Sequence, residues 1–131
     1  MIALVLFLLF GGELVGDFAF DLPNGYRCIR TNAVTVMIWT AKGPKSSLVV
    51  PPNIVKIGIQ GDFVFGKVEE SPESELADRS EPGYFILNTR TQWSLLGLPE
   101  EKWRRVLAKR KVKQIDLKNP RAFATSGKRT H

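Results

Sequence analysis

The residues that could perform chemistry are few, and their positions do not suit catalysis. His131 is the only histidine and stands last in the chain, while Cys28 is the only cysteine and lies in a strand-like run. A Ser-His-Asp or Cys-His site needs a histidine that the fold holds against the nucleophile, and a terminal residue is poorly suited to that role. One cysteine and one histidine also provide too few ligands for a structural zinc site. We therefore expect no nucleophilic or zinc-dependent catalysis, and we expect Cys28 to be a small buried residue.

Carboxylates offer the remaining chemical options. Asp17 and Asp21 lie on the polar side of an expected first strand, and paired carboxylates can act as acid and base when a cleft separates their pKa values. A small hydrolase is the third-ranked hypothesis on this ground. Residues 70–82 are rich in acidic side chains and predict an exposed loop, in which a hard cation is an alternative to simple solvation. The sequence favours a protein that is not an enzyme and that holds no metal or cofactor.

The strongest charge feature is a basic C-terminal quarter. Residues 1–98 carry eight Lys and Arg against ten Asp and Glu (net −2), whereas residues 99–131 carry eleven against three (net +8). Such a surface can attract anionic lipid, an acidic protein or a nucleic-acid backbone, and it can equally pair with the chain's own acidic segment or remain solvated. The candidate residues for binding an anionic partner are Lys102, Arg104, Arg105, Lys109, Arg110, Lys111 and Lys113.

The elements that must position these residues have the pattern of antiparallel β-structure. Segments that alternate apolar and polar residues run from 18 to 96, separated by Gly, Pro, Asn and Asp. Gly61-Asp62 between two such segments predicts a two-residue hairpin turn of type II′. The predicted fold class is mainly β: a small antiparallel sandwich or open barrel of about seven strands with one C-terminal amphipathic helix.

That helix is expected near residues 99–111 and would carry most of the basic side chains. Pro99 suits a first helical turn, and apolar residues recur at i, i+3 and i+4 from Trp103, which should therefore dock on the sheet. Residues 114–117 would add an edge strand. The basic segment 119–131 is expected to be a flexible tail.

Residues 1–12 have the character of an export signal. Nine apolar residues from Ile2 to Phe10 are too few to span a bilayer and match the core of a signal peptide. The alternative is that they form a buried first element of the fold. With a signal at 1–12, residues 13–118 would make a single β-rich domain, exported to the cell envelope or beyond; the cytoplasm is the alternative location.

Four phrases of the chain occur in a characteristic order: Asp21-Leu22-Pro23-Asn24-Gly25-Tyr26, Arg30-Thr31-Asn32-Ala33, Val50-Pro51-Pro52-Asn53-Ile54-Val55 and Gly83-Tyr84-Phe85-Ile86-Leu87-Asn88-Thr89. In this order they resemble a family of short exported bacterial proteins of unknown function, over about residues 16–110. The resemblance implies bacterial export and carries over no functional residues. Members often look like lipoproteins with a cysteine after the signal, which this chain lacks.

These observations predict a non-enzymatic binding domain, exported or associated with the envelope. Its expected partner is anionic lipid or an acidic envelope protein. The alternative is a cytoplasmic nucleic-acid-binding β module that uses the basic helix, with Trp93 or the aromatic residues of the strands as stacking platforms for bases. The sequence does not indicate an oligomeric state.

Overall fold

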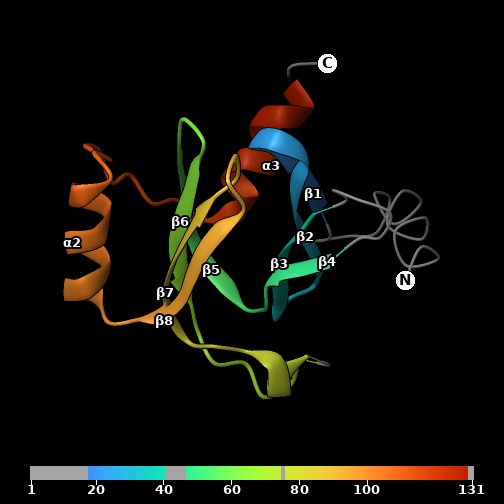
Figure 1. Ribbon diagram of the computed structural model, residues 1–131. Coiled ribbons are helices and arrows are strands. Elements are labelled where there is room, and N and C mark those ends of the chain that lie inside the picture. Colours follow the sequence, from blue (N-terminus) through green and yellow to red (C-terminus); the bar gives the residue numbers. More distant parts are fainter. Residues whose placement is uncertain (1–17, 41–46, 75, 130–131) are drawn as a thin grey trace.

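A computed structural model describes residues 18–40, 47–74 and 76–129, whose eight strands form two four-stranded antiparallel sheets (Figure 1). The first sheet has the strand order β1 (Phe18–Leu22), β2 (Tyr26–Asn32), β3 (Thr35–Thr40) and β4 (Ser47–Val50). The second has the order β5 (Ile54–Gln60), β6 (Phe63–Val68), β7 (Gly83–Asn88) and β8 (Trp93–Leu98). The sheets stack face to face without closing into a barrel, so the predicted mainly β sandwich is confirmed.

The main apolar core fills the space between the two sheets. Phe20, Cys28 and Ile38 are register neighbours across β1, β2 and β3, and all three point into this space. From the second sheet, Val64 and Leu87 contribute to the same core and are fully buried. Cys28 has no exposed surface, as expected for a small core residue.

The turn between β5 and β6 has the predicted geometry. Gln60 and Phe63 form the last cross-strand pair, which leaves Gly61 and Asp62 as the two turn residues. Gly61 has φ +59°, the positive value that the first position of a type II′ turn requires.

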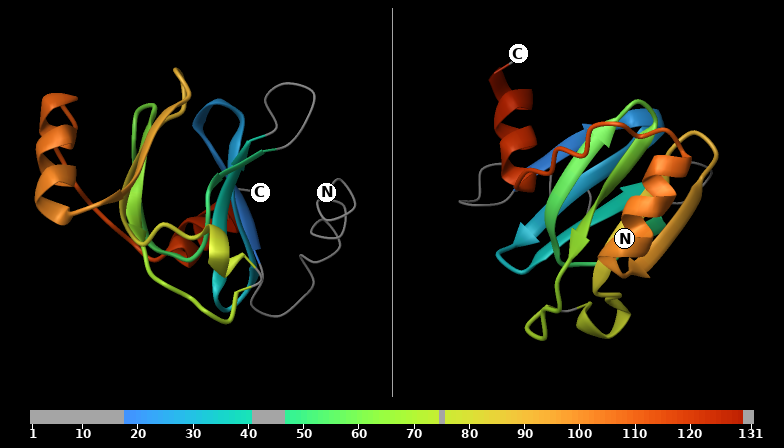
Figure 2. Two further views of the ribbon diagram at one scale, coloured as in Figure 1. Left: turned by 60° about the horizontal axis from the view of Figure 1, so that its bottom comes forward. Right: turned by 90° about the vertical axis from the view of Figure 1, so that its left-hand side faces the viewer.

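Helix α2 (Glu100–Lys109) forms a third layer on the outer face of the second sheet (Figure 2). Pro99 is its N-cap residue, and two glutamates in the first turn complement the helix dipole. Trp103 and Leu107 are fully buried and pack with Phe65 and Ile86, which face away from the core between the sheets. The predicted helix and the docking of Trp103 are both confirmed.

A β-bulge marks the place where α2 is anchored. Phe85 of β7 lies opposite two residues of β8, Leu96 and Gly97, and Gly97 has φ +68°. The indole Nε1–H of Trp103 donates a 2.9 Å hydrogen bond to the carbonyl oxygen of Phe85. The helix thus satisfies a backbone acceptor at the point where the ladder of β7 and β8 is irregular.

The flexible tail predicted for 119–131 is wrong over most of its length, because helix α3 (Pro120–Arg129) forms there. Phe123 stacks on Phe20 with ring centroids 5.5 Å apart, and Ala124 is buried in the core. The helix contacts β1 and β5, one strand from each sheet, and so covers one opening of the sandwich. Burial of one helical face stabilises α3, a tertiary effect that local propensity does not reveal.

The predicted edge strand at 114–117 is also wrong, since a single bridge takes its place. Lys118 exchanges two backbone hydrogen bonds of 2.9 Å with Ile57, on the free edge of β5. Gly58 permits this close approach, because a Cβ atom there would lie 2.8 Å from the carbonyl oxygen of Asp116.

The acidic stretch 70–82 is only partly the exposed loop that its composition predicts. Ser71 and Ser74 are buried, and the hydroxyl oxygen of Ser74 lies 3.0 Å from that of Thr35 in β3. A short 3-10 helix, η2 (Ala77–Arg79), follows within the stretch. Hydroxyl pairing with the first sheet therefore fixes the start of this connection.

The predicted export segment 1–12 and Asp17 lie outside the described residues. In the described ranges, neither α2 nor α3 has the length and apolar character needed to cross a membrane.

Candidate functional site

The seven basic residues singled out by the sequence lie together on α2 and the segment that follows it, and all seven are exposed. We call this set the basic surface: Lys102, Arg104, Arg105, Lys109, Arg110, Lys111 and Lys113. Because Trp103 and Leu107 bury the opposite side of α2, the four of these charges that lie on α2 are carried by a helix that is fixed to the sheet.

In the described part of the chain, two of the seven cations form an ion pair or a cation–π contact with another side chain. Arg104 pairs with Glu100 one turn earlier, with 2.9 Å between Nη2 and Oε2. The guanidinium carbon of Arg110 lies 4.4 Å from the ring centroid of Trp93, a cation–π contact. That contact covers one face of Trp93, so the predicted stacking platform for bases is partly occupied by the protein itself.

The described residues of the acidic stretch do not neutralise the basic surface. Among the described residues, Glu69 pairs with Lys67 at 3.8 Å, and no ion pair joins 69–81 to the basic surface. The intramolecular pairing that the two opposite charge runs suggested is therefore not formed in the described part of the chain.

Of the carboxylate and thiol candidates, Asp21 and Cys28 lie in the described part of the chain and do not form a reactive site there, whereas Asp17 lies outside it. The side chain of Asp21 is 86% exposed and pairs with Arg27, with 2.9 Å between Oδ1 and Nε. Burial raises the pKa of the Cys28 thiol, which therefore stays protonated near neutral pH. Within the described ranges, no three His, Cys, Asp or Glu side chains gather into a group that could hold a metal ion.

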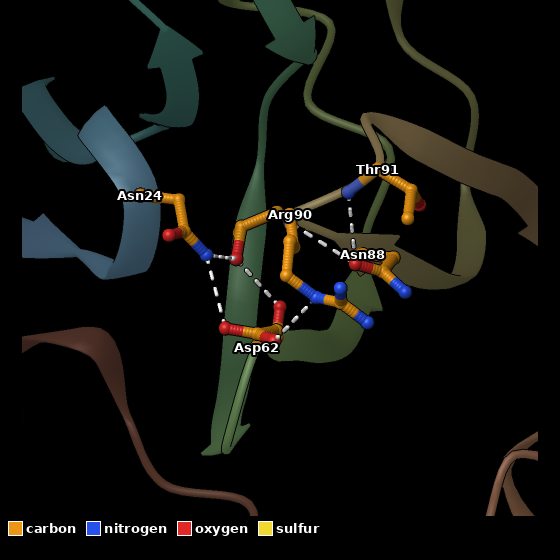
Figure 3. A network of polar contacts seen from close by, with 6 residues as sticks. Asn24, Asp62, Asn88, Arg90 and Thr91 are labelled. Carbon is orange, nitrogen blue, oxygen red and sulfur yellow. Dashed lines mark hydrogen bonds and ion pairs between the residues drawn. The ribbon is translucent and has the colours of Figure 1, made fainter.

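A polar network joins the two sheets at one end of the sandwich (Figure 3). Asn24 lies in η1 (Pro23–Gly25), the turn between β1 and β2, and has the left-handed conformation (φ 60°) that asparagine tolerates well. Its Nδ2 donates to Asp62 Oδ1 at 3.0 Å and to Thr89 Oγ1 at 2.8 Å. Thr89 Oγ1 in turn donates to the Asp62 carbonyl oxygen at 2.7 Å, and Arg90 Nε lies 3.1 Å from Asp62 Oδ2.

The members of this network, which we call the clamp, bond one another and so hold the two sheets together: Asn24, Asp62, Thr89 and Arg90. Asn24 and Thr89 belong to the first and the last of the four characteristic phrases of the sequence. Taken singly, those phrases indicate only turns and strands. The structure shows that the turn with Asn24, between β1 and β2, is hydrogen-bonded to the turn with Thr89, between β7 and β8.

A second site, which sequence reasoning missed, is a pocket of about 250 Å³ at the start of α3. We call it the arginine pocket because Arg30 of β2 and Arg121 of α3 both line it. Their guanidinium carbons lie 5.8 and 5.5 Å from the ring centroid of Phe18. Asn53 and Asn119 add polar groups to the wall.

The two asparagines also fix the backbone around this pocket. Asn119 Oδ1 accepts a 2.9 Å hydrogen bond from the amide of Arg121, which caps the N-terminus of α3. Asn53 Oδ1 accepts a 3.1 Å hydrogen bond from the amide of Val36 and so ties the start of β5 to β3. No spacing in the sequence links Arg30 to Arg121, because only the unexpected helix α3 brings them together.

Comparison with known protein families gives a match over residues 23–121, more than half of the chain. The chain belongs to the DUF3997 family. DUF3997 is described as a protein of unknown function, which confirms the expected family of unknown function and assigns no activity. The match includes the basic surface and both arginines of the arginine pocket. No curated protein and no solved structure matches the chain.

Proposed function

We propose that this protein is a non-enzymatic binding domain of the cell envelope that lies on anionic lipid headgroups through the basic surface. The observation that carries the proposal is the set of seven exposed cations. Among the described residues, Glu100 is the only carboxylate that forms an ion pair with one of them. The fixed position of α2 supports it further, since a helix backbone that is already ordered loses little conformational freedom on binding.

The charge balance gives the size of the expected attraction. Residues 100–113 hold seven cations and two glutamates, a net charge of +5. A basic residue near an anionic leaflet contributes about 1 kcal/mol, so the segment provides at most about 5 kcal/mol, a moderate and salt-dependent affinity. Attachment through this surface alone would therefore be reversible.

The envelope location is supported by the apolar segment 1–12, which has the length of a signal-peptide core. Fractionation of the native organism with N-terminal sequencing tests this part. We expect recovery outside the cytoplasm, without the apolar segment or held to the membrane by it. Recovery in the cytoplasm with Met1 intact would reject the location.

Vesicle binding tests the surface itself. The triple variant Lys102→Gln, Arg105→Gln, Lys109→Gln removes three exposed cations without breaking the Arg104 or Arg110 contacts. A matched control, Lys56→Gln, Arg79→Gln, Lys118→Gln, removes three exposed cations elsewhere and has the same net charge. Binding to vesicles that contain phosphatidylglycerol is expected to weaken by about 100-fold in the first variant and to change by less than about threefold in the control.

Two outcomes would reject lipid docking. One is equal loss in both triple variants, which would mean that net charge acts without a defined surface. The other is tighter binding to duplex or single-stranded nucleic acid than to the vesicles at the same salt concentration, with the same dependence on Lys102, Arg105 and Lys109. The second result would favour the nucleic-acid alternative.

A further inference from the structure

We propose that this protein enters an anionic bilayer by the end of the second sheet at which α2 ends, with Trp93 and Phe63 in the zone between headgroups and acyl chains. This mode of docking rests on the function proposed above and adds to it, because it names the part of the bilayer and the end of the molecule that meet. The β5–β6 turn, the β7–β8 turn and the C-terminal end of α2 lie at this same end (Figures 1 and 2).

Two aromatic side chains at this end lie beyond the part of the sheet that α2 buries. Phe63, Asn88 and Trp93 are cross-strand neighbours in β6, β7 and β8, so their side chains share the outer face of the second sheet. The next row on this face contains Phe65 and Ile86, which α2 buries. Phe63 and Trp93 are only partly buried, because they lie at the margin of that cluster. Apolar aromatic surface therefore remains accessible beside the end of the helix.

The two tryptophans of the second sheet and α2 differ in their indole N–H groups. Trp103 is fully buried and donates its N–H to the Phe85 carbonyl oxygen, as a core tryptophan should. In the described part of the chain, the N–H of Trp93 has no protein acceptor and is not enclosed. An apolar ring with an open polar tip is the form in which tryptophan collects at membrane–water interfaces. Trp93 has this form and Trp103 does not.

The charges around Trp93 match an anionic bilayer. Lys109, Lys111 and Lys113 are exposed and form no ion pair within the described ranges. The guanidinium carbon of Arg110 lies 4.4 Å from the ring centroid of Trp93, so a cation and an aromatic ring are held together. Basic side chains keep their charge at the headgroup level while their apolar stems lie deeper, beside aromatic rings. An anionic bilayer supplies both the charge for the cations and an apolar zone for the rings.

NMR of the full chain bound to phosphatidylglycerol nanodiscs tests the proposal when one lipid carries a spin label near the top of its acyl chain. The label broadens nearby resonances, and the three indole N–H signals give a comparison within one spectrum. We expect the strongest broadening at Trp93, less at the buried Trp103, and none at Trp39 in β3 of the first sheet. Backbone amides of Phe63 and Lys111 should broaden together with that of Trp93.

Substitution of one tryptophan at a time provides the matched control. Trp93→Gln removes the ring without changing the net charge and should weaken binding to phosphatidylglycerol vesicles about tenfold, since a partly exposed ring no longer leaves water. Trp39→Gln removes the partly buried tryptophan of the first sheet and should change binding by less than about twofold when the fold is retained. The spectrum of the original chain decides the question if Trp93→Gln does not fold.

Vesicle binding without selective broadening of Trp93, or with equal broadening of Trp39, would overturn this mode of docking and leave lipid docking through charge intact. Unchanged affinity of a folded Trp93→Gln variant would do the same. Absence of binding to the vesicles would reject lipid docking itself, so the failure of one proposal can be told from the failure of the other. Selective broadening at Trp93, Phe63 and Lys111 together with a weaker Trp93→Gln variant would support both.

Discussion

Substitution of Trp103 by phenylalanine tests how α2, and with it the basic surface, is held to the fold. The indole is fully buried, its Nε1–H donates to the Phe85 carbonyl oxygen at 2.9 Å, and its ring lies 4.5 Å from that of Tyr84. Phenylalanine keeps an aromatic ring in the same place but removes the donor. The buried carbonyl oxygen of Phe85 would then lose this partner at an irregular point of the ladder.

The expected cost follows from these contacts. Loss of the hydrogen bond to the buried carbonyl oxygen costs about 2 kcal/mol, and the void left by the smaller ring costs about 1 kcal/mol. The total is about 3 kcal/mol, against the roughly 5–15 kcal/mol by which a domain of this kind is stable. Amides of α2 should also exchange with solvent faster, because the helix loses its anchor.

Urea unfolding of the original chain and the variant measures this difference from the midpoints at constant slope. Trp93→Phe is the matched control, because Trp93 lies on β8, is only half-buried, and makes its described contact with Arg110 through the ring face. We expect the control to cost less than about 1 kcal/mol, as for a position near the surface. A cost for Trp103→Phe no greater than that of the control would refute the role assigned to the indole hydrogen bond.

Three further predictions concern the clamp, the thiol and α3. Asn24→Ala should cost about 3 kcal/mol and Asn24→Gly about 2 kcal/mol by urea unfolding, because both lose two hydrogen bonds but only alanine is strained at φ 60°; equal costs would contradict the strain argument. Cys28 should resist thiol reagents until the chain unfolds. Burial raises the pKa of the folded thiol, so the stability that this shift contributes is complete below the unfolded pKa of about 8.5 and is lost as the pH rises above that value. The free energy of unfolding should therefore fall between neutral and alkaline pH, and Cys28→Ala should lessen this fall. Phe123→Ala should cost about 2 kcal/mol and speed amide exchange in α3, since it removes the stack on Phe20; unchanged stability would show that α3 does not seal the core.

The two helices show why local patterns predicted one element and missed the other. Around Trp103, a capping proline, acidic residues in the first turn and an apolar repeat all favour a helix, and the tertiary contacts agree with them. The segment from Pro120 includes a glycine, a serine and a threonine, so its propensity is weak and its composition suggests a tail. It is helical because Ala124 is buried and Phe123 partly buried against the sandwich, and that surface exists only once the sheets have formed.

The two candidate sites also differ in whether local sequence patterns predict them. The residues of the basic surface could be predicted because they are close together in the sequence, on one amphipathic helix and the segment that follows it. The arginine pocket could not be predicted, because Arg30 and Arg121 are brought together only by the docking of α3. The pairing of the basic and acidic runs, which charge balance alone allowed, is absent from the described residues because α2 packs on the outer face of the second sheet.

The amino-acid order by itself determined the β-rich class, the hairpin at Gly61, the position of α2 and the concentration of positive charge near the C-terminus. These properties depend on residues that are neighbours along the chain, where side-chain period, turn geometry and helix capping act locally. Tertiary structure alone decided that Asn24 bonds Thr89, that α3 closes one opening of the sandwich, and that two distant arginines share a pocket. Such contacts depend on how the two sheets stack, and stacking is set by the burial of apolar surface over the whole domain.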